Sequence, residues 1–317
     1  MPLFASFTVR QFALAQMLLA VVLANMNPVF SKLLFSRGWT PLTLYFTTLI
    51  IVSIVLLVHE YIALERGARW GMSRRDVFGV AVSTLAAGVL SPILFFTGLT
   101  SVEASEALIL SSTLPLFVVC FGVLLLKERF TVQTVLGGIL LLAAMGVLLW
   151  PDLTAFHMSA GAPLIVGSSF FGAFATIIHK KYVVHRHLDS IVLVRTLASL
   201  LVVGIIILVT DPASMQRLTH PENIWLVLSV PVLVFLFPFF LFFGAIRNVK
   251  AVDVGIVEAA GRVFAIVVSS SILQEVLTSY HIWSMGLVVF GVVFINVPLT
   301  RWRIVPSRLL EIGPLRK

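Results

Sequence analysis

Residues 124–131 read Leu-Leu-Leu-Lys-Glu-Arg-Phe-Thr, and residues 271–278 read Ser-Ile-Leu-Gln-Glu-Val-Leu-Thr. Each segment closes an apolar run, and the glutamates of the two segments, Glu128 and Glu275, are 147 residues apart. Each segment is followed by a further apolar run that contains glycines. A motif that recurs at a fixed spacing indicates an internal repeat. We therefore predict two related halves, residues 1–151 and 152–317.

The composition of the chain excludes a soluble protein. Of its 317 residues, 59% are hydrophobic and 11% are charged, and the mean hydropathy is +1.08. Soluble domains are about 25% charged, whereas a helix that crosses a bilayer needs about 20 mainly apolar residues. Ten runs fit that need: residues 12–34, 42–58, 77–99, 104–126, 132–150, 162–183, 191–209, 224–245, 252–273 and 281–299. We expect an all-α integral membrane protein with ten transmembrane helices.

The ten runs divide evenly between the predicted halves. Because five is odd, the second half enters the membrane in the opposite sense to the first, which gives two inverted five-helix repeats. Inverted repeats of this kind are a common basis for alternating access around a site near the middle of the membrane.

The positions of the 22 Lys and Arg predict the orientation. With ten crossings, most of these residues lie on one side of the membrane, whereas Arg37 and Arg217 lie on the other side. The basic residues of the first side occur in loops around residues 66–75, 127–129, 180–186 and 247–250 and in the segment 301–317. Basic loops stay in the cytoplasm. We expect both termini in the cytoplasm and membrane lipids as partners, and the formal charge of +8 needs no nucleic-acid partner.

The stretch from Thr97 to Trp150 resembles the EamA-type ten-helix members of the drug/metabolite transporter superfamily. Its motifs are Gly98-Leu99, Leu114-Pro115-Leu116-Phe117, Leu126-Lys127-Glu128-Arg129, Gly137-Gly138 and Gly146-Val147-Leu148-Leu149. The resemblance implies a transporter of amino acids, drugs, nucleosides, sugars or other metabolites. It also implies a central cavity lined by spans one, three, four, six, eight and nine. The second half departs from the first, with Glu258 at the position of Ser111 and Arg262 at that of Pro115.

Glu258 and Arg262 are the main candidates for substrate binding. They are four residues apart, so they share one face of the ninth predicted helix. Ionisable groups inside a membrane span are costly and mark either a pathway or a buried pair. Glu258 is suited to an amine or a proton, and the planar fork of Arg262 is suited to a carboxylate or phosphate. The alternative is an ion pair that satisfies only itself.

Two further ionisable or polar candidates lie in the first and seventh spans. Asn27 precedes Pro28 and follows Asn25, which suggests an interrupted helix of the kind that lines transporter sites. Its amide suits a neutral polar ligand group, or it holds helices together. Arg195 lies one or two turns from the cytoplasmic end, where it either reaches a cavity or extends towards the interface.

The fourth span supplies the remaining candidates. Glu106 lies near its external end, where it lines the mouth of a cavity or sits in interfacial water. Ser111 and Ser112 lie deeper, just before Pro115. Because proline has no backbone N–H, Pro115 frees a carbonyl that kinks the helix or faces a cavity.

Other features are assigned structural roles. Glu128 and Glu275 lie at helix junctions, where capping is the favoured interpretation. The phenylalanines of residues 235–243 are read mainly as lipid-facing, and His185 and His187 lack the further ligands that a metal site needs. The chain has no P-loop, dinucleotide-binding glycine motif, HExxH or GxSxG. We predict no enzyme activity, cofactor or metal.

These features predict a secondary active transporter of the bacterial inner membrane that moves a small metabolite or drug, as an exporter. An amino acid or other zwitterion is the favoured cargo, and the energy source is the proton gradient or simple exchange. A monomer and a homodimer are equally compatible with the sequence. The alternative is a membrane-embedded sensor or scaffold without transport activity.

Overall fold

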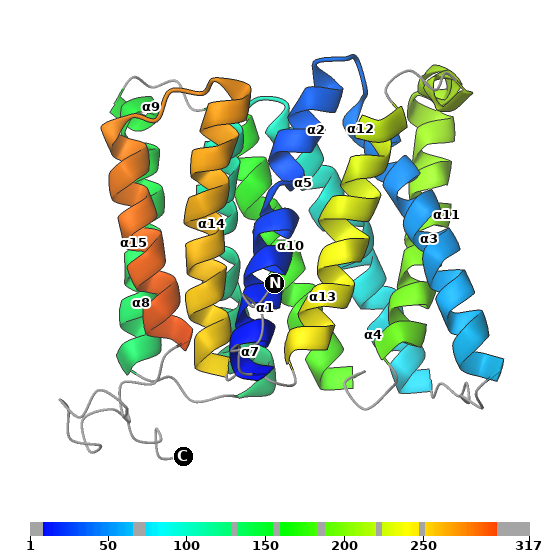
Figure 1. Ribbon diagram of the computed structural model, residues 1–317, viewed down its shortest axis with the longest axis horizontal. Coiled ribbons are helices and arrows are strands. Elements are labelled where there is room, and N and C mark those ends of the chain that lie inside the picture. Colours follow the sequence, from blue (N-terminus) through cyan, green and yellow to red (C-terminus); the bar gives the residue numbers. More distant parts are fainter. Residues whose placement is uncertain are drawn as a thin grey trace, which may run out of the picture.

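The computed structural model describes residues 9–65, 74–127, 132–154, 159–182, 188–219, 224–246 and 251–296, and every regular element in these ranges is a helix (Figure 1). Up to residue 154, in the first half and across its predicted boundary, the helices are α1 (Val9–Asn25), α2 (Asn27–Phe35), α3 (Pro41–Glu65), α4 (Arg74–Ser83), η1 (Thr84–Leu90), α5 (Ser91–Leu99), α6 (Ala104–Ser111), α7 (Leu114–Leu126), α8 (Val132–Leu148) and α9 (Trp150–Thr154). The rest of the second half contains α10 (Gly161–Tyr182), α11 (Leu188–Thr210), η2 (Pro212–Thr219), α12 (Ile224–Ser229), η3 (Val230–Leu236), α13 (Phe237–Ile246), α14 (Ala251–Leu273) and α15 (Ser279–Asn296).

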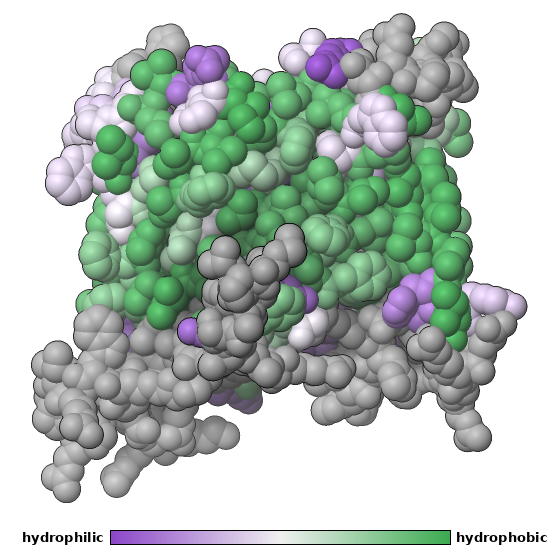
Figure 2. All heavy atoms as spheres, in the orientation of Figure 1, coloured by the Kyte–Doolittle hydropathy of each residue, from purple (hydrophilic) through white to green (hydrophobic). Residues whose placement is uncertain are grey.

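The long helices run roughly parallel to one another, and some lie behind others in the view, as α8 does behind α15 (Figure 1). Among the described residues, eight helical segments are long and apolar enough to cross a membrane, and two shorter apolar helices span Val132–Leu148 and Ser279–Ile295. Apolar side chains cover the middle of the molecule between more polar ends (Figure 2). The predicted all-helical membrane protein is therefore confirmed. The basic loops that predict the orientation lie largely outside the described ranges.

Two predicted spans are split where proline removes a backbone donor. The first span breaks at Met26, between α1 and α2, and Pro28 stands in the first turn of α2. The fourth span breaks between α6 and α7, with Pro115 in the first turn of α7. The interruption predicted at Asn27 is thus present, and the fourth span is also interrupted just before Pro115. In α10, the Ser169 hydroxyl donates at 3.4 Å to the Ser111 carbonyl, which lies four residues before Pro115.

The third and eighth spans share a different distortion. A π-helical stretch, η1 in one and η3 in the other, ends just before Pro92 and Pro238, which are 146 residues apart. Proline cannot donate to the carbonyl four residues earlier, and a π-helical turn is one way in which a helix absorbs that gap. Pro92 cannot supply the usual helical hydrogen bond to the carbonyl of Gly88, four residues earlier. That carbonyl accepts a hydrogen bond from the Tyr45 hydroxyl of α3 at 2.6 Å.

The internal repeat is visible in the backbone at the two motifs. Lys127 and Gln274, 147 residues apart, both have φ of 56°, and no other non-glycine residue of the described ranges has positive φ. Lys127 ends α7 in the left-handed conformation that commonly closes a helix. The corresponding Gln274 follows the last residue of α14. The sequence repeat is therefore also a repeat of local geometry.

Glu275 has the structural role that the sequence predicts. Its carboxylate accepts hydrogen bonds from the backbone N–H of Ala104 at 2.6 Å and of Ser105 at 3.0 Å, and from the Ser105 hydroxyl at 2.8 Å. It therefore caps the first turn of α6, where N–H groups lack partners and the helix dipole favours an anion. Lys32 of α2 lies 3.8 Å from the same carboxylate. Glu128 lies outside the described residues.

The last long helices of the two halves, α8 and α15, pack tightly against each other through glycines. A Cβ atom built on Gly137 would lie 2.8 Å from the Gly291 carbonyl, and one built on Gly291 would lie 3.0 Å from the Gly137 carbonyl. Small residues allow such close approach of backbones in membranes. The Gln133 side chain of α8 also donates to the Phe294 carbonyl of α15.

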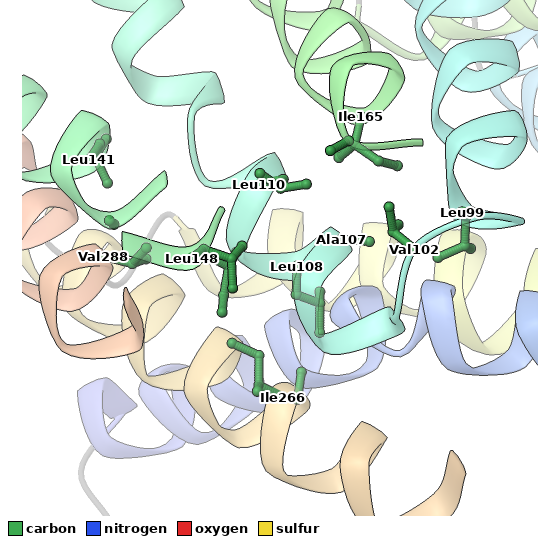
Figure 3. Close-up of a cluster of buried hydrophobic side chains, with 14 of the residues drawn as sticks. Leu99, Val102, Ala107, Leu108, Leu110, Leu141, Leu148, Ile165, Ile266 and Val288 are labelled. Atoms are coloured by element: carbon green, nitrogen blue, oxygen red, sulfur yellow. The ribbon is translucent and has the colours of Figure 1, made fainter. Parts of the chain in front are cut away.

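The largest buried cluster joins both halves. Figure 3 shows Leu110 of α6, Leu141 of α8, Ile165 of α10, Ile266 of α14 and Val288 of α15 within it. All five side chains are no more than 4% exposed. This cluster fixes α6 and α14 beside each other, so that the face of α14 with Glu258 and Arg262 is held towards α1 and α13.

Candidate functional site

A cavity of about 360 Å³ opens between α3, η1–α5, α11 and η3–α13. We call it the Arg195 cavity. Its polar wall consists of Asn27, Tyr45, Thr48, Ser91, Ser168, Arg195, Thr196 and Ser199. Its apolar wall includes Leu49, Val52, Phe95, Phe96, Phe235 and Phe239. Arg195 is the only charged residue among its described lining residues.

Two hydroxyl groups next to Arg195 donate hydrogen bonds to backbone carbonyls. The Thr196 hydroxyl donates to the Val192 carbonyl at 2.7 Å, and the Ser199 hydroxyl donates to that of Arg195 itself at 2.8 Å. The half-buried Arg195 guanidinium makes no hydrogen bond or ion pair with any residue that the structure describes. The wall therefore presents a cation whose donors are free.

A second cavity, of about 410 Å³, lies between α1–α2, η3–α13 and α14. We call it the Arg262 cavity. Glu258 and Arg262, both half-buried, supply its only charges among the described residues, and Ala20, Val21, Ala24, Pro238 and Phe242 are among its apolar walls. Positions equivalent to Ser111 and Pro115 of the first half are thus occupied here by charged side chains at a cavity wall.

The two charged residues of the Arg262 cavity do not form a closed pair. Glu258 and Arg262 line the same space, yet no ion pair within 4.0 Å joins them in this conformation. The Nη1 atom of Arg262 is buried and has no hydrogen-bond partner among the described residues. A guanidinium nitrogen buried without an acceptor is costly. The geometry therefore leaves both groups available to a third partner.

Asn27 connects the two cavities. Asn27, Phe235 and Phe239 line both of them. The Oδ1 atom of Asn27 accepts a hydrogen bond from the Ser31 hydroxyl at 3.0 Å, which fixes the orientation of the amide. Because Asn27 begins α2 directly after the break at Met26, the interruption of the helix brings this side chain to the junction of the two spaces.

The other three predicted residues lie elsewhere. Glu106 is half-buried in the first turn of α6, and it lines neither the Arg195 nor the Arg262 cavity. The Ser111 and Ser112 hydroxyls both donate to the Leu108 carbonyl, at 3.0 and 2.9 Å, and line neither cavity. The cavity walls bring together Asn27, Arg195, Glu258 and Arg262, whereas Glu106, Ser111 and Ser112, in α6 and directly after it, lie apart from them.

Sequence reasoning missed several cavity residues. Tyr45 and Thr48 of α3 carry no local motif, since a tyrosine or threonine in an apolar run is common. For the phenylalanines of residues 235–243 the sequence favours a lipid-facing position for most and leaves an aromatic cavity wall as the alternative. Phe235 and Phe239 line both cavities. Their spacing of four residues, which places both side chains on one helix face, is the signal that could have identified them.

Residues 11–150 and 159–297 each match the EamA-like transporter family. The chain belongs to this family. Two curated relatives are an uncharacterized transporter of Methanothermobacter thermautotrophicus, 25% identical over 211 residues, and an uncharacterized transporter in the sor 3'region of Acidianus ambivalens, 32% identical over 108 residues.

The alignments with these two relatives cover 64% and 34% of this EamA-like chain, and 60% and 40% of the relatives' own lengths. A protein of known crystal structure superposes on 93% of this chain and on 100% of its own, with a TM-score of 0.65 and 16% sequence identity. That similarity shows a common fold. Together with the apolar helices, the family membership identifies this chain as a multi-pass membrane protein of the EamA-like transporter family.

No group of three or more His, Cys, Asp or Glu side chains is arranged to hold a metal ion within the described ranges. His185 and His187, rejected as metal ligands from the sequence, lie outside those ranges.

Proposed function

We propose that this EamA-like protein is a secondary active transporter that exports a small metabolite or drug across the cytoplasmic membrane of a bacterium by alternating access. In this proposal the chain crosses the membrane ten times, with both termini in the cytoplasm. Residues 1–151 and 152–317 form inverted repeats, and α8 and α15 provide the fifth and tenth crossings. Their lengths of 17 and 18 residues are at the short end of the range of about 17–25 residues for spanning helices.

One observation carries the proposal of a substrate site: the unpartnered Nη1 atom of Arg262 at the wall of the Arg262 cavity. An arginine near the middle of a membrane span costs about 2.5–3.5 kcal/mol or more. A cost of this size is retained where the charge serves a ligand. A zwitterion fits the two groups, with its carboxylate on the guanidinium of Arg262 and its ammonium on the carboxylate of Glu258. An amino acid is therefore the favoured cargo.

Alternating access requires contacts that close the transporter on one side of the membrane and that break later in the cycle. In the proposed topology, Glu275 lies on the external side, where it joins the first turn of α6 to the end of α14 and approaches Lys32 of α2. These contacts would hold the external side closed while the cavities receive cargo from the cytoplasm. The breaks at Met26 and at η1 and η3 provide places where the lining helices bend.

Proton coupling is assigned to Glu258. The carboxylate of Glu258 lines the same cavity as the guanidinium of Arg262, so cargo that engages Arg262 would alter the charges around Glu258. Protonation of Glu258 in one orientation and its release in the other would then drive export. Glu106, Ser111 and Ser112 remain candidates for cargo contacts in a second conformation, in which α6 has moved relative to its neighbours.

The experiment that tests this function compares purified wild-type protein with Glu258→Gln and Arg262→Gln in a thermal-shift screen of amino acids, nucleosides, sugars, polyamines and cationic drugs, followed by uptake of any hit into proteoliposomes. Ligands that prefer the folded state raise its melting temperature. We expect an amino acid hit that is lost in both variants and retained in Arg37→Gln, which neutralises an exposed arginine outside both cavities.

The outcomes separate the rival functions. A hit that is transported and lost in both cavity variants supports the proposed site. Hits that persist in both variants move the site away from Glu258 and Arg262. Binding without uptake, at any imposed proton gradient, supports the membrane-embedded sensor or scaffold instead. Transport by Glu258→Gln at the wild-type rate with unchanged pH dependence overturns the coupling role.

A further inference from the structure

Arg195 is a second cation that the zwitterion site leaves unexplained. It lies on α11, seven residues from the first residue of that helix, and its guanidinium has no described partner. The Arg195 cavity contains no carboxylate among its described lining residues. The neighbouring Tyr45 hydroxyl donates its proton to the Gly88 carbonyl, so it is not an anion in this arrangement. Nothing in the wall therefore neutralises this charge.

The two adjoining cavities together carry an excess of positive charge. Arg195 and Arg262 contribute two cations and Glu258 one carboxylate, and the remaining described lining residues are neutral. An uncompensated charge interacts strongly with any ligand charge in a space of low dielectric. A zwitterion leaves that excess unchanged. A cargo with a net negative charge removes it.

The two cavities adjoin each other, so one cargo molecule can occupy both. Asn27, Phe235 and Phe239 belong to the walls of both. Around Arg195 the wall is largely apolar, with Leu49, Phe95 and Phe96 among its members. The part of the cargo that enters this cavity must therefore combine an acidic group with an apolar segment.

We propose that Arg195 binds an additional carboxylate or phosphate group of the cargo, and that the cargo of this transporter is an organic anion with an apolar segment between its charged ends. The planar guanidinium suits this group because it donates two parallel hydrogen bonds to a carboxylate or phosphate. The inference rests on the proposed transport function and narrows its substrate class from zwitterions to acids with a net negative charge.

The test uses matched pairs of ligands that differ in one acidic group. Thermal shifts of the full-length protein are measured with L-glutamate against L-glutamine, with phenylsuccinate against 3-phenylpropionate, and with glycerol 3-phosphate against glycerol. We expect the more acidic member of at least one pair to bind at least tenfold more tightly. If the more acidic ligand binds more tightly in the first two pairs, the group that Arg195 binds is a carboxylate. If it does so only in the third pair, that group is a phosphate.

Two variants connect that preference to Arg195. We expect Arg195→Gln to abolish the difference within a pair and Arg195→Lys, which retains the charge, to preserve part of it. The unliganded melting temperature of Arg195→Gln should be no lower than that of the wild type, because its guanidinium has no described partner to lose. This readout separates a ligand-binding role from a merely structural one.

The contrary outcomes are equally specific. Equal responses within every pair, no response to any acid, or an unchanged preference in Arg195→Gln overturns the inference. A loss of preference with a strongly lowered unliganded melting temperature in both Arg195 variants assigns Arg195 to structure and also overturns it. Failure of the proposed zwitterion site appears separately, as wild-type responses in Arg262→Gln.

Discussion

Replacement of Glu275 should destabilise the junction between the two halves. Its side chain is 7% exposed, and it accepts three hydrogen bonds from the first turn of α6, at 2.6, 3.0 and 2.8 Å. A hydrogen bond to a charged group contributes about 1.5–3 kcal/mol, and the contributions overlap when one group makes several. Lys32, 3.8 Å away and 25% exposed, adds little because it is partly solvated.

We therefore expect Glu275→Ala to lower the free energy of unfolding by about 3–4 kcal/mol. In a chain of this size, that loss corresponds to a fall of about 5–10 °C in melting temperature. Glu275→Gln keeps one oxygen acceptor but turns an amide NH₂ towards an N–H donor, so we expect about two thirds of the effect of the alanine variant. The assay is thermal unfolding of detergent-purified protein, followed by circular dichroism at 222 nm.

Glu103 provides the matched control. Its carboxylate is 46% exposed and lies 3.8 Å from His281, and it is 3.5 Å from the Ser105 hydroxyl, whose proton is directed to Glu275. Such long and exposed contacts contribute about 1 kcal/mol or less. We expect Glu103→Gln to melt within about 2 °C of the wild type. If Glu275→Ala melts as close to the wild type as Glu103→Gln does, the capping argument is refuted.

Four further substitutions test other features by the same melting assay. Gly137→Ala should cost about 1–3 kcal/mol, because the new methyl group would meet the backbone of α15, whereas Gly286→Ala, with nothing within 4 Å, should be neutral or stabilising. Tyr45→Phe should cost about 1–2 kcal/mol by leaving the Gly88 carbonyl without its donor, and a melting curve identical to the wild type would contradict this. Arg195→Met should raise unliganded stability by about 1–2 kcal/mol, since it removes an unpaired charge from the membrane span; a lower stability would argue against an unpartnered guanidinium.

The sequence predicted the helical class, the repeat and the broken first helix because these features depend on local patterns. Apolar length identifies a crossing, and a proline such as Pro28 or Pro115 marks a break wherever it stands in a helix. The role of Glu275 was also predictable, because a carboxylate at a helix junction lies near unpaired N–H groups. Its partner, the start of α6 at Ala104, was not, since it lies 171 residues away in the sequence.

The site was predicted less completely, for a physical reason. A membrane helix that is apolar on every side gives no indication of which face meets its neighbours. The Ser111 hydroxyl donates to a carbonyl of its own helix, whereas Phe239 lines both cavities, and neither orientation follows from the sequence. Charged residues were easier to place, because Arg195 and Arg262 are too costly to face lipid. Whether Ser111, Ser112 or Glu106 contacts cargo stays a prediction.

The cap on α6 has a consequence for biosynthesis. Ala104 and Ser105 leave the ribosome 171 and 170 residues before the carboxylate that caps them. At about 5–20 residues per second, that interval lasts roughly 10–30 s. During this interval the N–H groups of the first turn of α6 in the nascent first half are uncapped. The glycines of α8 also have no α15 to pack against. The insertion machinery must therefore retain an unfinished half-bundle until the last two helices arrive, and truncation before Glu275 should yield a product that quality-control proteases remove.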